Sequence, residues 1–129
     1  MAERSTTLGS SDSTTARGQR AEALACAHLI ENGYRIIERN VRARIGEIDI
    51  VAEEGEVLCF VEVRSKHDAE HGDPLETINR PKQRRILRAA ERYLAADQAQ
   101  RYVRFDVIGI VYQPELQVTL VRDAFDATR

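Results

Sequence analysis

The chain has 129 residues, of which 43% are hydrophobic and 31% are charged, and this predicts one globular domain with a real core. The net charge of −2 excludes binding to nucleic acid through overall charge, so such a role needs a local basic patch. No apolar run is long enough to span a membrane, and no signal-peptide region is recognisable. We therefore expect a cytoplasmic protein. Cys26 and Cys59 fit buried apolar positions rather than a zinc site.

The first 14 residues are rich in Ser and Thr and almost lack large apolar side chains, so we expect a disordered tail over 1–14 and a single domain over 15–129. A helix is predicted from about Thr15, as its N-cap, to Asn32, with Gly33 as a suitable stop. The residues that recur at spacings of three and four, and so form its buried stripe, are Ala21, Leu24, Ala25, His28 and Leu29.

Glu22 lies beside this stripe, and periodicity alone favours a solvated helix carboxylate at that position. A strand is predicted over 34–40, and a basic segment that contains Arg42 and Arg44 follows it. That segment has two readings of equal weight. It is either a solvated loop or an edge that contacts phosphate groups.

The segments 46–52 and 57–66 predict a β-hairpin. The first alternates apolar and polar residues, whereas the second is an almost unbroken apolar run until Glu62 and Arg64 interrupt it. Buried strands are normally depleted of charge, so these two side chains need a reason.

The turn of the hairpin sets which residues face each other. If 55–56 is a two-residue loop, Asp49 faces Glu62 and Glu47 faces Arg64. A four-residue loop shifts the pairs but keeps Asp49 and Glu62 on one face. Only a loop of odd length separates them.

Carboxylates that face each other across two strands have Cβ atoms about 4.5–5.5 Å apart, so they repel unless they share a proton or a cation. The alternative is that Asp49 and Glu62 are solvated at frayed ends. It is disfavoured because Glu62 lies between Val61 and Val63. Oxygen ligands suit Mg²⁺, with Mn²⁺ as an alternative ion, and a bound divalent ion activates water and neutralises charge on phosphate. With a cation at Arg64, phosphodiester hydrolysis is the natural reaction class.

The segment 67–74 is predicted to be a solvated loop, because its two histidines and its acids fit no strong metal motif; a flap near an active site is the alternative. A second helix begins after Asn79 or Arg80 as its cap, with Pro81 at its first position. Its buried stripe consists of Ile86, Leu87, Ala90, Tyr93 and Leu94. Its other face is strongly basic, which favours a surface for a polyanion over a merely solvated face. The residues that we expect to bind nucleic acid are Arg42, Arg44, Lys66, Arg80, Lys82, Arg84, Arg85 and Arg88.

Two further strands are predicted over 102–111 and 116–121. Asp106 interrupts the first of them. It either pairs with Arg104 or another arginine of the sheet, or supports the acidic site, and the sequence leaves this open. Phe125 is expected to pack onto the body. The order is α-β-β-β-α-β-β, which predicts an α/β fold with a mixed sheet of about five strands flanked by helices.

At these residues the chain resembles the PD-(D/E)xK nuclease superfamily, with Asp49 in the aspartate position and Glu62-Val63-Arg64 as the ExK element. More narrowly, it resembles the YraN family, predicted nucleases similar to archaeal Holliday junction resolvases. The resemblance covers about 17–126. It rests on Gly18, Glu22, Ala25, Gly33-Tyr34, Arg39-Asn40, Gly46-Glu47-Ile48-Asp49, Phe60-Val61-Glu62-Val63-Arg64, Lys82 and Arg104-Phe105-Asp106-Val107.

The resemblance implies a restriction-endonuclease-like core and a catalytic set of Asp49, Glu62, Arg64 and Glu22. Relatives use an acid on the first helix as an additional metal-site residue, and Glu22 matches that position. Resolvase-like relatives act as symmetric dimers, so a homodimer is implied too. Two positions depart from the superfamily pattern, since Ile48 replaces the proline before the motif aspartate and Arg64 replaces the lysine.

Three hypotheses follow. The first is a Mg²⁺-dependent endonuclease that acts on DNA, including branched or structured DNA. The second is a non-catalytic nucleic-acid-binding module that retains the nuclease fold. Arg64 motivates it, because arginine stays protonated and does not replace a lysine that acts as a general base. The third is a structural domain whose acids form internal ion pairs, such as Glu47 with Arg64.

Overall fold

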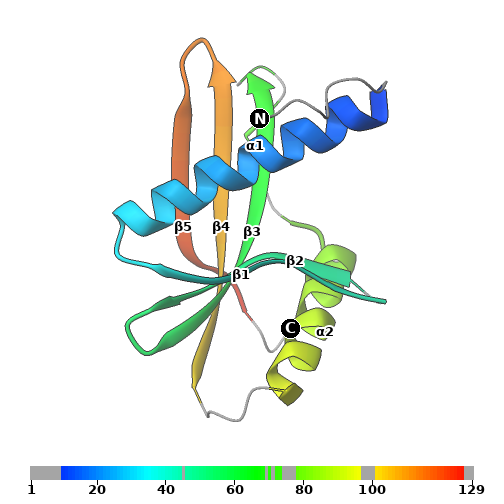
Figure 1. Ribbon diagram of the computed structural model, residues 1–129, viewed down its shortest axis with the longest axis vertical. Coiled ribbons are helices and arrows are strands. Elements are labelled where there is room, and N and C mark those ends of the chain that lie inside the picture. The colour runs from blue at the N-terminus through cyan, green and yellow to red at the C-terminus, as the bar shows by residue number, and fades with distance from the viewer. Residues whose placement is uncertain are drawn as a thin grey trace.

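The computed structural model describes residues 10–44, 46–68, 70, 72–73, 78–96 and 101–126. Two helices and five strands follow each other along the chain (Figure 1). They are α1 (Ser10–Glu31), β1 (Arg35–Ala43), β2 (Gly46–Glu54), β3 (Val57–Asp68), α2 (Arg80–Ala96), β4 (Tyr102–Gln113) and β5 (Gln117–Phe125). This confirms the predicted α-β-β-β-α-β-β order.

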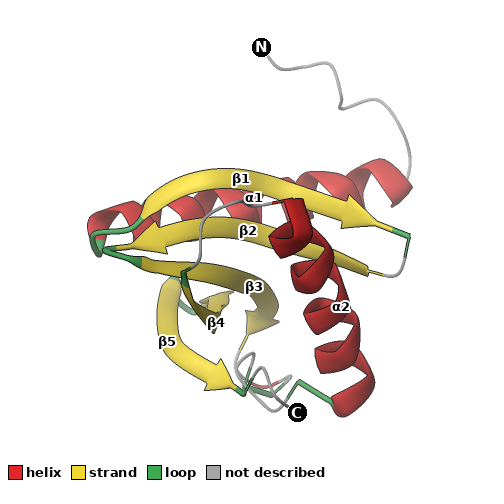
Figure 2. Cartoon of the chain, turned by 90° about the horizontal axis from the view of Figure 1, so that it is seen from below, coloured by secondary structure: helices red, strands yellow, loops and turns green. Residues whose placement is uncertain are grey.

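The strands form one mixed sheet in the order β1-β2-β3-β4-β5. Only β3 and β4 run parallel; the other neighbouring pairs are antiparallel. Parallel neighbours need a crossover connection, and α2 provides it. Figure 1 shows α1 running across β3, β4 and β5, and Figure 2 shows α1 and α2 separated by the strongly curved sheet.

Each helix covers its own hydrophobic cluster. On the α1 side, Ala21, Ala25 and Leu29 pack against inward-facing residues of β2, β3 and β4. On the α2 side, Ile86, Ala89 and Ala90 pack against Phe60 and Phe105 among others. Phe125 stacks on Phe105 with ring centroids 5.0 Å apart, as predicted. Both cysteines are buried and free, which confirms their predicted apolar role. No helix in the described part of the chain is long and apolar enough to cross a membrane.

Several element boundaries differ from the prediction. β1 continues to Ala43, so Arg42 belongs to a strand and not to a loop, and β5 continues to Phe125. Helix α1 begins at Ser10 instead of about Thr15, since extending a formed helix adds one hydrogen bond for each residue that is fixed. Residues 1–9 of the predicted tail lie outside the described residues. The predicted loop over 67–74 is wrong at its start, because β3 continues to Asp68, which pairs with Gln113 of β4. Positions 69, 71 and 74 of that segment lie outside the described residues.

The β2–β3 hairpin has the predicted two-residue register. Gly55 adopts a positive φ of 61°, which a tight turn requires and glycine permits, and Glu54 pairs with Val57. The pairing continues only to Ile50 with Val61. Beyond that pair, β2 stays with β1 while β3 stays with β4, so the two strands separate.

The start of α2 is fixed by Asn79 and by a close approach to β2. The Asn79 side chain accepts a hydrogen bond from the Lys82 backbone N–H at 2.9 Å, so Asn79 is the N-cap. A Cβ atom on Gly46 would lie 2.7 Å from the backbone oxygen of Arg85. Glycine at this position therefore lets the helix rest directly on the first residue of β2.

Asp106 belongs to a buried network rather than to the acidic site. It is fully buried and accepts hydrogen bonds from Tyr34 Oη at 2.7 Å, from the Arg104 guanidinium at 2.8 Å and from the Asp123 N–H at 2.9 Å. Arg104 also donates to Glu54 at 2.6 Å. This answers the question that the sequence left open, and it ties the β2–β3 hairpin and β5 to β4.

Candidate metal and nucleic-acid site

Asp49 and Glu62 lie at the point where β2 and β3 separate, one residue beyond the last backbone pair. The Asp49 carboxylate turns toward β3 and accepts a hydrogen bond from the Val63 backbone N–H at 2.8 Å. Ile48 and Ile50 lie in different hydrophobic clusters although they are two residues apart, so the alternation of β2 breaks at Asp49. The separation of the strands thus leaves Asp49 and Glu62 without a cross-strand backbone partner on each other's strand.

The pKa of Asp49 rises to about 7. Burial is the main cause, the negative charge of Glu62 is the second, and Glu22 and Glu47 add smaller effects; the hydrogen bond from Val63 opposes them. The hairpin register predicted that Asp49 and Glu62 lie close together. The effect of the Glu62 charge on the Asp49 pKa agrees with this prediction. A cation or a proton would relieve this repulsion.

Glu22 is only 9% exposed, so the prediction of a solvated carboxylate from periodicity alone is wrong. The cause is a tertiary contact. Asn40, at a positive φ of 54°, donates to Glu22 at 3.0 Å, and Arg39 lies 3.6 Å away. Asparagine tolerates this left-handed conformation better than most residues. Asn40 belongs to a motif on which the family resemblance rests, but it was not predicted as a site residue.

A hollow of about 350 Å³ beside α1 brings Glu22 and Asp49 together, and we call it the acidic hollow. It is lined by Gly18, Gln19, Ala21, Glu22, Asn40, Arg42, Glu47, Asp49, Val63 and Ser65. Glu62 borders a different hollow. Among the described residues, no three His, Cys, Asp or Glu side chains converge closely enough to hold a metal ion together. The predicted trio is therefore a neighbouring set rather than a closed cage.

Glu62 faces the start of α2. It is 8% exposed, and the Lys82 Nζ lies 3.3 Å from its Oε2. A second hollow of about 360 Å³, here the lysine hollow, is lined by Glu62, Val63, Arg64, Ser65, Lys66, Asn79, Lys82 and Arg85. Arg64 therefore shares a hollow with Glu62, as their spacing of two residues predicts. Lys82 brings an ammonium group to the acidic pair from another element.

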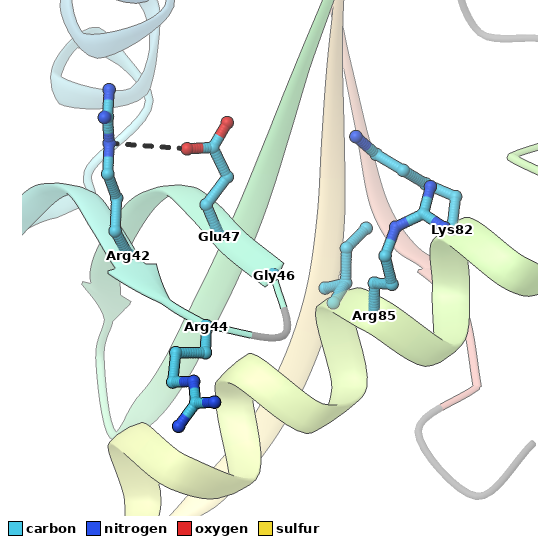
Figure 3. A pocket seen from close by; sticks show the side chains of 7 residues that line it. Arg42, Arg44, Gly46, Glu47, Lys82 and Arg85 are labelled. Carbon is cyan, nitrogen blue, oxygen red and sulfur yellow. Dashed lines mark ion pairs between the residues drawn. The ribbon is translucent and has the colours of Figure 1, made fainter.

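A third hollow, the basic groove, lies between side chains of the β1–β2 hairpin and of α2, beside the point where the two elements touch. It has a volume of about 360 Å³ and is lined by Arg42, Arg44, Gly46, Glu47, Lys82, Arg85 and Ile86. Figure 3 shows Arg42 and Glu47 projecting from the hairpin while Lys82 and Arg85 project from α2. Glu47 pairs with Arg42 at 3.5 Å, so the expected partner Arg64 is wrong; β2 has already left β3 at this point.

The remaining predicted basic residues lie elsewhere. Arg80, Arg84 and Arg88 are exposed on α2 at spacings of four residues and line none of the three hollows just described. Like charges at this spacing repel and destabilise a helix slightly. None of these three arginines forms an ion pair with a described acid. A row of exposed cations therefore runs along α2 next to the basic groove.

Comparison with known proteins assigns the family. The model of the uncharacterised protein family UPF0102 matches residues 21–110. The chain belongs to the UPF0102 family. A UPF0102 protein of Chromohalobacter salexigens is 40% identical over 92% of this chain and 97% of its own length. The UPF0102 proteins of Clostridium tetani, 40% identical over 84% of this chain and 92% of theirs, and of Chlorobium chlorochromatii, 46% identical over 77% of each, are also similar.

Membership of UPF0102 confirms the predicted YraN family. The matched region contains Asp49 and Glu62 of the hairpin. It also contains Glu22 of α1 and Lys82 of α2. The family is described as uncharacterised, so chemistry for this site has to come from its residues.

Proposed function

We propose that this UPF0102 protein is a Mg²⁺-dependent endonuclease that hydrolyses phosphodiester bonds of DNA, including branched or structured DNA. One observation carries the proposal. Asp49 and Glu62 lie near each other where β2 and β3 separate, and the basic groove and the row of arginines on α2 lie beside them. Acids that bind a cation next to bases that bind phosphate are the parts that metal-assisted phosphodiester hydrolysis needs.

The donor set fits a hard divalent cation. Mg²⁺ binds proteins through one or two carboxylates and keeps several waters, so Asp49 and Glu62 suffice without a third ligand. The raised pKa of Asp49 favours the fit, because its repulsion from Glu62 is what a cation removes. When bound, such an ion supplies an acidified water and neutralises charge on the phosphate. Mn²⁺ meets the same requirements.

Lys82 and Arg64 together take the roles that one lysine has in the superfamily pattern. Lys82 Nζ lies 3.3 Å from Glu62 and faces both the lysine hollow and the basic groove. It holds Glu62 in place and donates hydrogen bonds to a phosphate oxygen, where negative charge develops during hydrolysis. Arg64 stays protonated and orients the phosphate. Glu22 acts as a positioning residue that adds negative charge near Asp49.

The resemblance to the PD-(D/E)xK superfamily supports the same assignment. The Gly46-Glu47-Ile48-Asp49 and Phe60-Val61-Glu62-Val63-Arg64 segments form the two arms of one hairpin. The similarity to archaeal Holliday junction resolvases, implied by these motifs, is the reason to include four-way junctions among the substrates.

The test is a cleavage assay over duplex, single-stranded, flap and four-way-junction DNA with Mg²⁺ and with Mn²⁺. The wild-type protein is expected to cut at least one substrate, and Glu62→Ala is expected to lose the activity. Absence of cleavage on every substrate with both ions contradicts the proposal.

A second candidate is a DNA-binding module without catalysis, and Arg64 at the lysine position is the observation that favours it. This module would bind DNA in a salt-sensitive way that survives Glu62→Ala and fails when Arg84, Arg85 and Arg88 are neutralised. Binding that disappears only when the carboxylates are removed contradicts this alternative.

A further inference from the structure

A fourth hollow lies outside the site described above, between the N-terminal half of α1 and the far ends of β3 and β4. Its volume is about 710 Å³, roughly twice that of the acidic hollow, and we call it the α1 pocket. The charged and aromatic residues that line it are Arg17, Arg20, Lys66, His67 and Tyr112. No acid is among its described lining residues. Its charge therefore favours an anionic ligand.

A cation–π contact holds one of these positive charges in the α1 pocket. The Arg20 guanidinium lies 5.0 Å from the centroid of the Tyr112 ring, so a cation is held over the pocket wall. Of these residues, the sequence reasoning singled out only Lys66 for nucleic acid. It placed His67 in a loop, whereas His67 belongs to β3.

The α1 pocket adjoins the acidic hollow. Gly18 and Ser65 line both, and Ser65 also lines the lysine hollow. The acids therefore lie between two basic surfaces, the basic groove on one side and the α1 pocket on the other. A chain of phosphates that crosses the acids from the basic groove enters the α1 pocket next.

Gly18 leaves open space beside the helix backbone at this junction. It lies inside α1, where glycine destabilises a helix relative to alanine. A Cβ atom at Gly18 would meet nothing within 4 Å, so packing inside the protein does not require glycine. Absence of a side chain where two hollows join leaves room for something that passes close to the helix backbone.

We propose that the α1 pocket is a second phosphate-binding subsite, which receives the nucleic-acid strand that continues past the acidic hollow and crosses α1 at Gly18. The path of the strand, from the acidic hollow into the α1 pocket, rests on the proposed function. The pocket itself is argued from its own charge, its position next to the acidic hollow and Gly18. An acidic segment of a protein would match the charge, but it would not account for the matching basic groove beyond the acids.

Gly18→Ala gives the sharpest test, because the subsite makes stability and binding move in opposite directions. Thermal denaturation is expected to show a higher melting temperature, since alanine favours the helix. Fluorescence anisotropy without divalent ions is expected to show DNA binding weakened at least about fivefold, since a methyl group obstructs the strand. Stronger stability with unchanged DNA affinity overturns the inference.

The double variant Arg17→Gln/Arg20→Gln tests the charge. Each lost phosphate contact should reduce the slope of log affinity against log salt by about one, equally for DNA and RNA of one sequence. Arg35→Gln, on β1 and paired with Glu53, is the control and should leave the slope unchanged. Equal slopes in the double variant and the wild type contradict the subsite and leave an acidic protein as its ligand.

Failures of the two proposals are distinguishable. If the wild type cuts no nucleic acid but these variants weaken binding, the subsite stands and the endonuclease proposal falls. If the wild type cuts and the variants bind and cut as well as it does, the endonuclease stands and the subsite falls.

Discussion

In the folded protein, the ionised form of Asp49 is disfavoured. Its pKa is about 7 in the folded protein against 3.8 for a free side chain, because burial and the charge of Glu62 oppose the ionised form. The folded protein therefore binds more protons than the unfolded chain between these values, so stability falls as the pH rises through that window. Above pH 7 the full cost is present.

Asp49→Asn should remove this cost while keeping an oxygen for the Val63 N–H. We expect the variant to be more stable than the wild type at pH 8, by on the order of 2–4 kcal/mol, and to differ little at pH 4. Urea unfolding at both pH values measures this. Glu47→Gln, a weaker contributor to the same pKa, is the matched control and should give a smaller gain. A variant that is less stable at pH 8 contradicts this reading of the acidic pair.

The same repulsion predicts a response to metal. Mg²⁺ bound to the folded state alone should raise the melting temperature of the wild type at pH 8, and Asp49→Asn should lose most of this shift. Differential scanning calorimetry with and without the ion measures it. Equal shifts in both proteins would place the binding ion elsewhere.

Lys82 is predicted to matter for rate more than for binding. Lys82→Gln should lower the cleavage rate at saturating DNA by roughly 100-fold or more, because it removes a charge-stabilising donor next to Glu62. Single-turnover kinetics separate this from affinity. Arg88→Gln, an exposed cation of the same helix, is the control and should change affinity rather than rate. Equal losses of affinity in the two variants and no loss of rate would make Lys82 an ordinary phosphate contact.

For single residues, the sequence predicts contacts within an element or hairpin but not contacts between distant elements. The spacing of Glu62 and Arg64 and the register from Gly55 follow from strand geometry alone. The contact of Lys82 with Glu62 depends on where α2 rests, and the burial of Glu22 depends on Asn40 in β1. No periodicity within one element encodes either contact.

Among the elements, β4 is held by the buried network around Asp106. Replacing Asp106 with alanine leaves the Arg104 charge with fewer partners and leaves the Tyr34 hydroxyl proton without its acceptor. We expect a loss of about 3–5 kcal/mol in urea unfolding. Tyr34→Phe, which removes the two hydrogen bonds that the Tyr34 hydroxyl makes with Asp106 and Arg104, should cost only about 1–2 kcal/mol. Similar small losses in both variants would contradict the role given to Asp106.

Helix α2 depends on Gly46. An alanine there would place Cβ 2.7 Å from the Arg85 carbonyl oxygen, which is backbone and has little room to move. Gly46→Ala should therefore shift α2 and lower both stability and DNA affinity. Gly18→Ala is the contrasting variant, since its Cβ meets nothing. Proton–nitrogen correlation spectra with large changes confined to α2 and β2 would support this, whereas an unchanged spectrum would contradict it.

Element order and the mixed sheet follow from periodicity and turn signals, but the separation of β2 from β3 does not. In the sequence, apolar and polar residues of β2 keep alternating on the far side of Ile50, and β1 still pairs with this part of the strand. Nothing in the sequence of either strand marks the point at which their mutual pairing stops. That point is what opens the site at Asp49.

Over the whole molecule, the charge is nearly balanced yet unevenly placed. The net charge is −2, while the basic groove and α2 carry cations that have few acidic partners among the described residues. Neutralising Arg84, Arg85 and Arg88 together should reduce the salt slope of DNA binding by up to about three. Arg122 lies on β5 and is held by Glu54 of β2, so Arg122→Gln is the control and should leave the slope unchanged. A slope unchanged in the triple variant would remove α2 from the interface.

Metal-assisted catalysis by Asp49 and Glu62 is measured by single-turnover cleavage of labelled four-way-junction and duplex DNA in Mg²⁺, with wild type, Asp49→Asn and Glu62→Gln purified in parallel. Parallel purification exposes any contaminating nuclease, which would cut equally in all three. The account predicts that the wild type cuts and that both variants lose at least about 100-fold in rate while they still bind DNA. Equal cleavage by all three proteins, or none by the wild type with either Mg²⁺ or Mn²⁺, would contradict it.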